Sequence, residues 1–164
     1  KERRWVLVAV ACFSAVALPI RWAALLYPGG GLEIWRTATT LAASSLLTAV
    51  VLSKVMRPGA VTRDRLQGGI AAYLLLGLSW ASAYEWTALI DPDAFGGVAT
   101  AGGSSKQWVY YSLVTLTTMG YGDITPVSPV ARSLAVGEAL TGQLYLAILI
   151  SRLVALELKS RAEP

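Results

Sequence analysis

Apolar side chains occur in long runs along this chain. Four stretches contain no charged residue and a fifth contains one, and they cover residues 6–20, 37–53, 66–84, 107–122 and 133–151. A helix rises about 1.5 Å per residue, so about 20 residues cross a hydrocarbon core of about 30 Å. Four segments reach this length and are predicted to be transmembrane helices, at about Trp5–Tyr27, Ile34–Met56, Leu66–Ile90 and Val130–Leu158.

The uncharged run at 107–122 differs from the others. It ends in the sequence MGYG at 119–122, and Asp123 and Pro126 follow it. The run is too short, and too rich in glycine at its end, to span a membrane as one helix. We therefore predict a re-entrant segment between the third and fourth spans, with a helix at about 105–117 followed by a loop.

Composition supports a membrane protein and excludes several other classes. Of the 164 residues, 55% are hydrophobic and 15% charged, and the mean hydropathy is +0.55. The expected fold class is an all-α integral membrane protein. The chain has no histidine and a single cysteine, Cys12, which excludes His- or Cys-type zinc sites, His-based catalysis and an intrachain disulfide. The sequence contains no P-loop or dinucleotide fingerprint, and we expect neither an enzyme nor a cofactor.

The basic residues indicate orientation. A net charge of +4 would suit a nucleic-acid partner in a soluble protein, but here the basic residues flank apolar runs, so we expect the lipid bilayer and no nucleic acid. Ten of the 14 basic residues share one side of a four-span topology: Lys1, Arg3, Arg4, Lys54, Arg57, Arg63, Arg65, Arg152, Lys159 and Arg161. The positive-inside rule makes that side cytoplasmic, which predicts a multi-pass cell-membrane protein with both termini inside.

A secretory signal peptide is the competing interpretation of the first span. Residues 1–4 would be its basic region, and the apolar run that follows would be its hydrophobic region. Cleavage after this segment would leave the placement of all later spans unchanged.

The segment at 115–123, TLTTMGYGD, resembles the selectivity filter of potassium channels, which usually reads TVGYG followed by Asp. The similarity extends over 66–158 and is greatest to bacterial ion channels of the two-pore-domain-type pore family. It implies a pore domain in 61–164, and the two apolar spans ahead of this domain give two N-terminal helices in 1–60. Within the pore domain it implies an outer helix, a pore helix, a filter and an inner helix at 66–90, 105–117, 118–122 and 130–158.

The physical chemistry of the predicted filter supports the same interpretation. Dehydrated K⁺ needs several oxygens at once, and neutral carbonyls hold it weakly enough for release. Aiming successive carbonyls at one axis requires left-handed backbone at alternate positions, which Gly120 and Gly122 tolerate. The carbonyls of 118–121 would then bind K⁺, and the Thr118 hydroxyl would close the inner end. One strand offers too few oxygens, so we expect a homotetramer with one filter strand per chain.

Met119 is a departure from the family pattern, which has Val or Ile at this position. An unbranched thioether packs less rigidly than a β-branched side chain, so we expect a K⁺-selective filter that inactivates or leaks more readily. Two alternatives stay open. One is a weakly selective cation channel, and the other is a non-conducting membrane scaffold or sensor subunit.

The resemblance also implies residues that support the filter. Trp108, Tyr110 and Tyr111 stand where the family places an aromatic cuff, although aromatics in a membrane protein also serve as interfacial anchors. Asp123 matches the carboxylate at the filter mouth, and Tyr110 is expected to donate a hydrogen bond to it. Thr117 directly precedes the filter.

The predicted inner helix holds one acid, Glu138, and a glycine, Gly142. Intramembrane carboxylates are costly, and we expect the hydroxyl of Thr115 or Thr117 to satisfy Glu138, in either a functional or a structural role. Gly142 resembles the gating hinge of the family, and close helix packing is the alternative. Helical spacing from this hinge predicts that four residues face the cavity: Gln143, Leu146, Ile150 and Val154.

The first two spans lack an arginine at every third position, which excludes a voltage sensor of the S4 type. Their small polar residues suit helix packing, and Glu33 is expected to pair with Arg36 at i, i+3.

Overall fold

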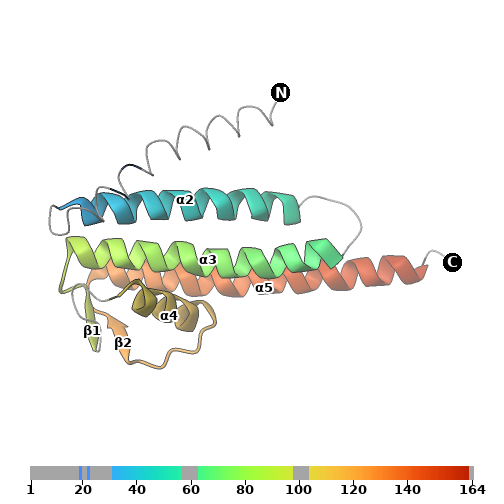
Figure 1. Cartoon of the computed structure of the whole chain (residues 1–164). Helices are drawn as coiled ribbons and strands as arrows, with labels where there is room; N and C mark the ends of the chain where they lie inside the picture. Colours follow the sequence, from blue (N-terminus) through green and yellow to red (C-terminus); the bar gives the residue numbers. More distant parts are fainter. Residues whose placement is uncertain (1–18, 20–21, 23–30, 57–62, 98–103, 163–164) are drawn as a thin grey trace.

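A computed structural model describes Pro19, Trp22 and residues 31–56, 63–97 and 104–162 (Figure 1). Its elements follow in the order α2 (Leu32–Val55), α3 (Arg63–Ile90), β1 (Phe95–Gly97), α4 (Ser105–Leu116), β2 (Ile124–Pro126) and α5 (Pro129–Ala162). Apart from two residues, the predicted first span lies outside this part of the chain. The same holds for Cys12 and the possible signal peptide.

Within the described residues, three helices are long and apolar enough to cross a membrane: Leu32–Val55, Arg65–Ile90 and Pro129–Arg152. They coincide with the second, third and fourth predicted spans. Between 11% and 33% of each apolar window is buried inside the chain, so the single chain covers only a minority of these residues fully. A soluble protein rarely exposes apolar surface on this scale, whereas a membrane protein presents it to lipid or to neighbouring subunits.

Local sequence signals explain where the helices that frame the loop begin. Pro129 occupies the first position of α5, where its missing N–H costs no hydrogen bond. The preceding Ser128 hydroxyl accepts the amide N–H of Ala131 at 3.2 Å, as an N-cap residue does. The Ser104 side chain caps α4 by accepting the amide N–H of Lys106.

The two strands are an addition to the predicted all-α fold. β1 and β2 pair antiparallel, with Phe95 opposite Pro126 and Gly97 opposite Ile124. Gly97 adopts a φ of 86°, and a Cβ there would collide with the carbonyl oxygen of Asp123. The small sheet therefore ties the segment after α3 to the segment that follows the predicted filter.

The core lies where α3, β1 and α4 meet. Its centre is an aromatic cluster in which the ring centroids of Tyr84 and Tyr111 are 4.7 Å apart, and those of Phe95 and Trp108 are 4.9 Å apart. All four side chains are buried, together with Ile124 of β2. This core holds α4 in place beside the two long helices of the predicted pore domain.

Helix α2 packs along α3, as Figure 1 shows. The hydroxyls of Thr48 and Ser79 lie 3.1 Å apart across their interface. The predicted pairing of Glu33 with Arg36 is wrong, because Arg36 instead forms a salt bridge of 3.0 Å with Glu85 of α3. Packing brings α3 against the face of α2 that carries Arg36, and a partly buried carboxylate there is a better partner than exposed Glu33.

The opposite ends of α2 are joined to other elements. Near its N-terminal end, Glu85 also accepts a hydrogen bond from the hydroxyl of Ser105, the first residue of α4. At its C-terminal end, the Arg152 guanidinium of α5 donates to the carbonyl oxygen of Met56 at 2.8 Å. This arginine therefore lies at the same end of the molecule as Lys54, in agreement with the predicted sidedness of these two basic residues.

Candidate functional site

The segment predicted to be the filter begins where α4 ends. Thr117 caps the helix, and its hydroxyl donates to the carbonyl oxygen of Leu113 at 2.7 Å. The amide N–H of Thr118 then bonds to the carbonyl oxygen of Thr115, and that of Met119 bonds to the carbonyl oxygen of Val114, both at 2.9 Å. These hydrogen bonds thus fix the start of the candidate filter, residues 118–122, against the last turn of α4.

The backbone of this segment alternates in handedness. Thr118, Gly120 and Gly122 have φ angles of 58°, 57° and 77°, while Met119 and Tyr121 between them do not have positive φ. The two glycines take the conformation that their spacing predicted. Thr118 does so as well, although a β-branched residue resists positive φ and was not expected to adopt it.

The candidate filter lies on the surface of the single chain. Residues 117–122 are all exposed, and the exposed fractions of Met119 and Tyr121 are 59% and 63%. A Cβ added at Gly120 or Gly122 would meet no atom of this chain within 4 Å. Positive φ, rather than crowding within the chain, therefore explains the need for glycine at these two positions.

The structure separates the three aromatics that were predicted to form one cuff. Tyr110 stacks on Tyr121 of the filter segment, with ring centroids 6.5 Å apart and planes 8° from parallel. Trp108 and Tyr111 instead pack against Phe95 in the core. They share a face of α4 that points away from Tyr110, since helix geometry places neighbouring residues on different faces.

Asp123 lies directly after the filter segment. Hydrogen bonding to Asp123 raises the pKa of Tyr110, with smaller contributions from desolvation and from the charge of this carboxylate. The Oδ1 of Asp123 also accepts the amide N–H of Ile124 at 3.1 Å. The Tyr110 hydroxyl thus stays a neutral donor beside a carboxylate that is tethered to the start of β2.

Glu138 is fully buried at the meeting point of three helices. Tyr84 of α3 donates its hydroxyl to Oε2 at 2.5 Å, and the Ser112 hydroxyl oxygen of α4 lies 2.5 Å from Oε1. The prediction that Thr115 or Thr117 satisfies Glu138 is wrong, because these hydroxyls bond to carbonyl oxygens of their own helix. Ser112 lies nearly one turn earlier, on the face of α4 that meets α5, and its hydroxyl lies between Glu138 and the carbonyl oxygen of Gly77.

Tyr84 and Ser112 are site residues that the sequence interpretation missed. Tyr84 lies 54 residues before Glu138, and Ser112 lies 26 residues before it, so helical spacing within one segment cannot reveal them. A sequence signal did exist. A buried carboxylate requires hydrogen-bond donors, and in the uncharged stretches of this chain the side chains of Ser, Thr and Tyr are the main ones that can supply them.

Gly142 lets α5 approach the end of α4. A Cβ at this position would collide with the carbonyl oxygen of Leu116, the last residue of α4. The Tyr73 hydroxyl of α3 donates to the same carbonyl at 3.2 Å. Close packing, one of the two roles considered for Gly142, is therefore present in the structure, and the gating-hinge role remains a prediction.

The predicted cavity residues follow Gly142 along α5. The side-chain amide of Gln143 donates to the Thr118 hydroxyl, with Nε2 and Oγ1 3.2 Å apart. Leu146, Ile150 and Val154 are all exposed on the single chain. Their spacing of three or four residues places them on one face of α5 with Gln143, although their position at a cavity stays a prediction.

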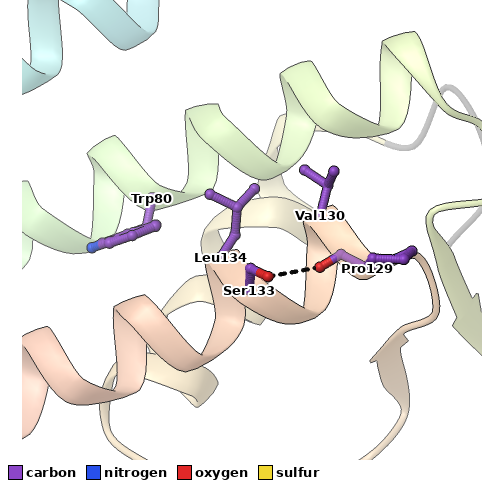
Figure 2. Close-up of a pocket in the computed structure, with 5 residues that line it drawn as sticks. All are labelled: Trp80, Pro129, Val130, Ser133 and Leu134. Carbon is purple, nitrogen blue, oxygen red and sulfur yellow. Dashed lines mark hydrogen bonds between the residues drawn. The ribbon is translucent and has the colours of Figure 1, made fainter.

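A separate groove of about 370 Å³ opens between α3 and the first turns of α5. Figure 2 shows Trp80 of α3 across from Val130 and Leu134, with Pro129 and Ser133 completing the lining. The Ser133 hydroxyl donates a hydrogen bond to the carbonyl oxygen of Pro129, 2.9 Å away. The groove is predominantly apolar, and none of its lining residues belongs to the candidate filter.

Comparison with known proteins assigns the chain to a protein family. Residues 72–158, more than half of the chain, match a protein family described as ion channel. The chain belongs to this ion channel family. The matched region includes α4, the candidate filter and most of α5. Together with the apolar helices, this match supports a multi-pass membrane protein of the ion channel family.

Curated relatives of this channel chain confirm its resemblance to potassium channel pores. The two pore potassium channel c of Oryza sativa subsp. japonica is 33% identical over 86 residues, 52% of this chain and 17% of the relative. The inward rectifier potassium channel Kirbac3.1 of Paramagnetospirillum magnetotacticum is 40% identical over 53 residues, 32% of this chain and 18% of the relative. Protein LctB of Bacillus caldotenax is 44% identical over 46 residues, 28% of this chain and 34% of the relative. The chain thus spans about a third or less of these relatives.

Proposed function

We propose that this protein is a potassium-selective channel that passes K⁺ passively across the cell membrane. The observation that carries the proposal is the alternation of positive φ at Thr118, Gly120 and Gly122 in the sequence TMGYG. A strand that alternates in this way turns successive carbonyl oxygens toward one side. Such a row can replace the hydration shell of a dehydrated cation, as carbonyl-lined filters do.

The proposed ligands are the carbonyl oxygens of Thr118, Met119, Gly120 and Tyr121, with the Thr118 hydroxyl at the inner end. Gly122 supplies the last left-handed turn of the strand. K⁺ is the transported ion, and the proposal requires no cofactor. Neutral oxygens suit transport, because an ion bound only by carbonyls can leave again when the next one enters.

The proposal includes a homotetramer built around the filter. One chain carries one filter strand, whose residues 117–122 are exposed. Backbone at membrane depth is tolerated only where it is buried in protein or lines a water-filled cavity. Four strands around an axis would bury Met119 and Tyr121 between subunits and leave the carbonyls facing the pore.

The surrounding elements have definite roles in this proposal. Helix α4 is the pore helix of a re-entrant segment, and its C-terminal carbonyls favour a cation below the filter. Asp123 and Tyr110 support the outer mouth, while Leu146, Ile150 and Val154 line the inner cavity. The proposed topology has four spans, with both termini cytoplasmic and the filter mouth outside.

Flux through proteoliposomes that contain the purified protein tests the proposal. We expect K⁺ flux well above Na⁺ flux, block by Ba²⁺, and loss of flux in Gly120→Ala, because alanine resists positive φ. Gly137→Ala is the matched control, since a Cβ at this helical position would meet only the end of the Trp80 ring, at 3.3 Å. Equal K⁺ and Na⁺ flux would indicate a weakly selective cation channel, and no flux at all would indicate a scaffold or sensor subunit.

A further inference from the structure

Gln143 is placed so that it reaches the inner end of the candidate filter. The preceding Gly142 holds the backbone of α5 against the carbonyl oxygen of Leu116, where α4 ends and the chain turns toward the filter. From this position the Gln143 side chain donates its amide N–H to the Thr118 hydroxyl oxygen, 3.2 Å away. The hydrogen bond joins two residues 25 positions apart in the sequence.

The direction of this hydrogen bond matters for a cation. A threonine hydroxyl has one hydrogen and two acceptor lone pairs, and it rotates to suit its partners. When an amide N–H occupies one lone pair, the oxygen still has a second lone pair for an ion. Without that donor the hydroxyl can rotate and point its hydrogen toward the ion, which opposes binding.

The backbone at Thr118 gives a second reason for such support. Thr118 adopts a φ of 58°, and it is the one residue other than glycine with positive φ in the described part of the chain. A β-branched residue in this region carries a conformational cost, so surrounding contacts must hold it there. The backbone N–H of Thr118 bonds to Thr115, and Gln143 holds its side chain.

We propose that Gln143 is a positioning residue of the filter, which orients the Thr118 hydroxyl oxygen as a ligand for the innermost K⁺. The inference rests on the proposed function, because it assigns a role within the same tetrameric filter. Four copies of Gln143 would then surround the cytoplasmic entrance of the filter, and each would act through the Thr118 hydroxyl to which it donates.

Block by Ba²⁺ added from the cytoplasmic side of a purified, reconstituted channel tests this role. Ba²⁺ is close to K⁺ in size and doubly charged, so it occupies the same oxygens and reaches the inner end first. We expect Gln143→Leu to weaken Ba²⁺ block at least about tenfold, because each of the four subunits loses one hydrogen bond to a ligand of the innermost ion. Leu144→Ala is the control, because this adjacent residue is exposed and is not part of the proposed filter machinery.

A double-mutant cycle separates positioning from a general effect on the pore. In a Thr118→Ala background the hydroxyl is gone, so Gln143→Leu should change Ba²⁺ block by less than about twofold. If Thr118→Ala does not conduct, calorimetric titration of the purified variants with K⁺ replaces the block measurement, and the same loss of coupling is expected.

Three results would overturn the inference, and only one of them would also remove the proposed function. Normal Ba²⁺ block in Gln143→Leu, in a channel that still selects K⁺, would show that Gln143 does not position the filter. An equal effect of Gln143→Leu with and without the Thr118 hydroxyl would show that it acts by another route. An unmodified protein with neither K⁺-selective flux nor K⁺ binding would contradict both proposals.

Discussion

Thr118 shows at the scale of one residue how the candidate filter departs from simple backbone preferences. Its φ of 58° continues the alternation set by Gly120 and Gly122, although it lacks the freedom of glycine. The glycine positions were predictable from their spacing of two. The conformation of Thr118 was not, because it depends on contacts with Thr115 and Gln143 that only the folded chain provides.

Met119 supplies the first prediction at this scale. Its side chain is unbranched and exposed on the single chain, so in a tetramer it would pack loosely behind the filter. We expect Met119→Val to stiffen the filter, lengthen open periods and raise the K⁺/Na⁺ permeability ratio severalfold. Bi-ionic reversal potentials and single-channel recordings measure both quantities. Identical selectivity and open-state stability in the two proteins would show that the thioether is inconsequential.

Glu138 supplies a second prediction, which follows from counting hydrogens. The Ser112 hydroxyl lies 2.5 Å from Glu138 Oε1 and 2.7 Å from the carbonyl oxygen of Gly77, but it has only one hydrogen. Tyr84 supplies a second hydrogen, to Oε2. A side chain at 138 that contributes one hydrogen of its own would satisfy every short contact in the cluster.

Glutamine at this position has the same length, and one of the two hydrogens of its amide can be donated to the Ser112 oxygen. We therefore expect Glu138→Gln to stay within about 1 kcal/mol of the parent in stability. Glu138→Leu should lose about 2 kcal/mol, because the buried Tyr84 hydroxyl loses its acceptor while Ser112 keeps the Gly77 carbonyl oxygen. Thermal unfolding in detergent compares the two variants. A glutamine variant as unstable as the leucine variant would contradict the hydrogen count and indicate that the cluster requires a carboxylate charge.

At the scale of elements, the contact between α5 and the end of α4 governs the position of the filter. Gly142 makes it possible, since any side chain there meets the Leu116 carbonyl oxygen. We expect Gly142→Ala to lower stability by about 2 kcal/mol or more and to reduce flux, because α5 must move away from α4. Gly137→Ala, with its wider clearance, should cost less than about 1 kcal/mol.

Thermal unfolding and flux measured together on both alanine variants test this prediction. A Gly142→Ala protein with parental stability but altered channel opening would instead favour the hinge role. Parental behaviour in both measurements would contradict the close-packing account.

Helix α2 is attached to α3 by a salt bridge, which supplies a second prediction at this scale. Arg36 bridges α2 to Glu85, which in turn accepts from Ser105 at the start of α4. We expect Arg36→Gln to lower stability by about 1 kcal/mol, because the pair is only partly exposed and Glu85 would lose its cation. Glu33→Gln is the control and should be neutral. Equal effects of the two substitutions on thermal unfolding would contradict the observed pairing.

The elements themselves were predictable to different degrees. The apolar runs indicated α2, α3 and α5 because membrane length and helix rise together limit the alternatives. Strands β1 and β2 escaped notice, since each has three residues and β1 contains two glycines. The partners of Arg36 and Glu138 also escaped, because they come from other helices and depend on packing rather than on local spacing.

At the scale of the whole molecule, the single chain leaves its candidate filter and much of its apolar surface exposed. The sequence predicted four copies from the number of oxygens that an ion requires. The exposed segment at 117–122 is a separate reason to expect neighbouring subunits, because they would bury its backbone within the membrane. We expect the purified protein to be a tetramer in detergent or lipid nanodiscs. Native mass spectrometry or multi-angle light scattering measures this, and a monomer or dimer that still conducts K⁺ would contradict the assembly.

The central claim is that four copies of this chain form a filter that selects K⁺, and the bi-ionic reversal potential of the purified protein in planar bilayers tests it most directly. With K⁺ on one side and Na⁺ on the other, a carbonyl-lined filter predicts a reversal potential far from zero, with the sign of K⁺ selectivity, and loss of current in Gly120→Ala. A reversal potential near zero, or an unchanged current in that variant, would contradict the account.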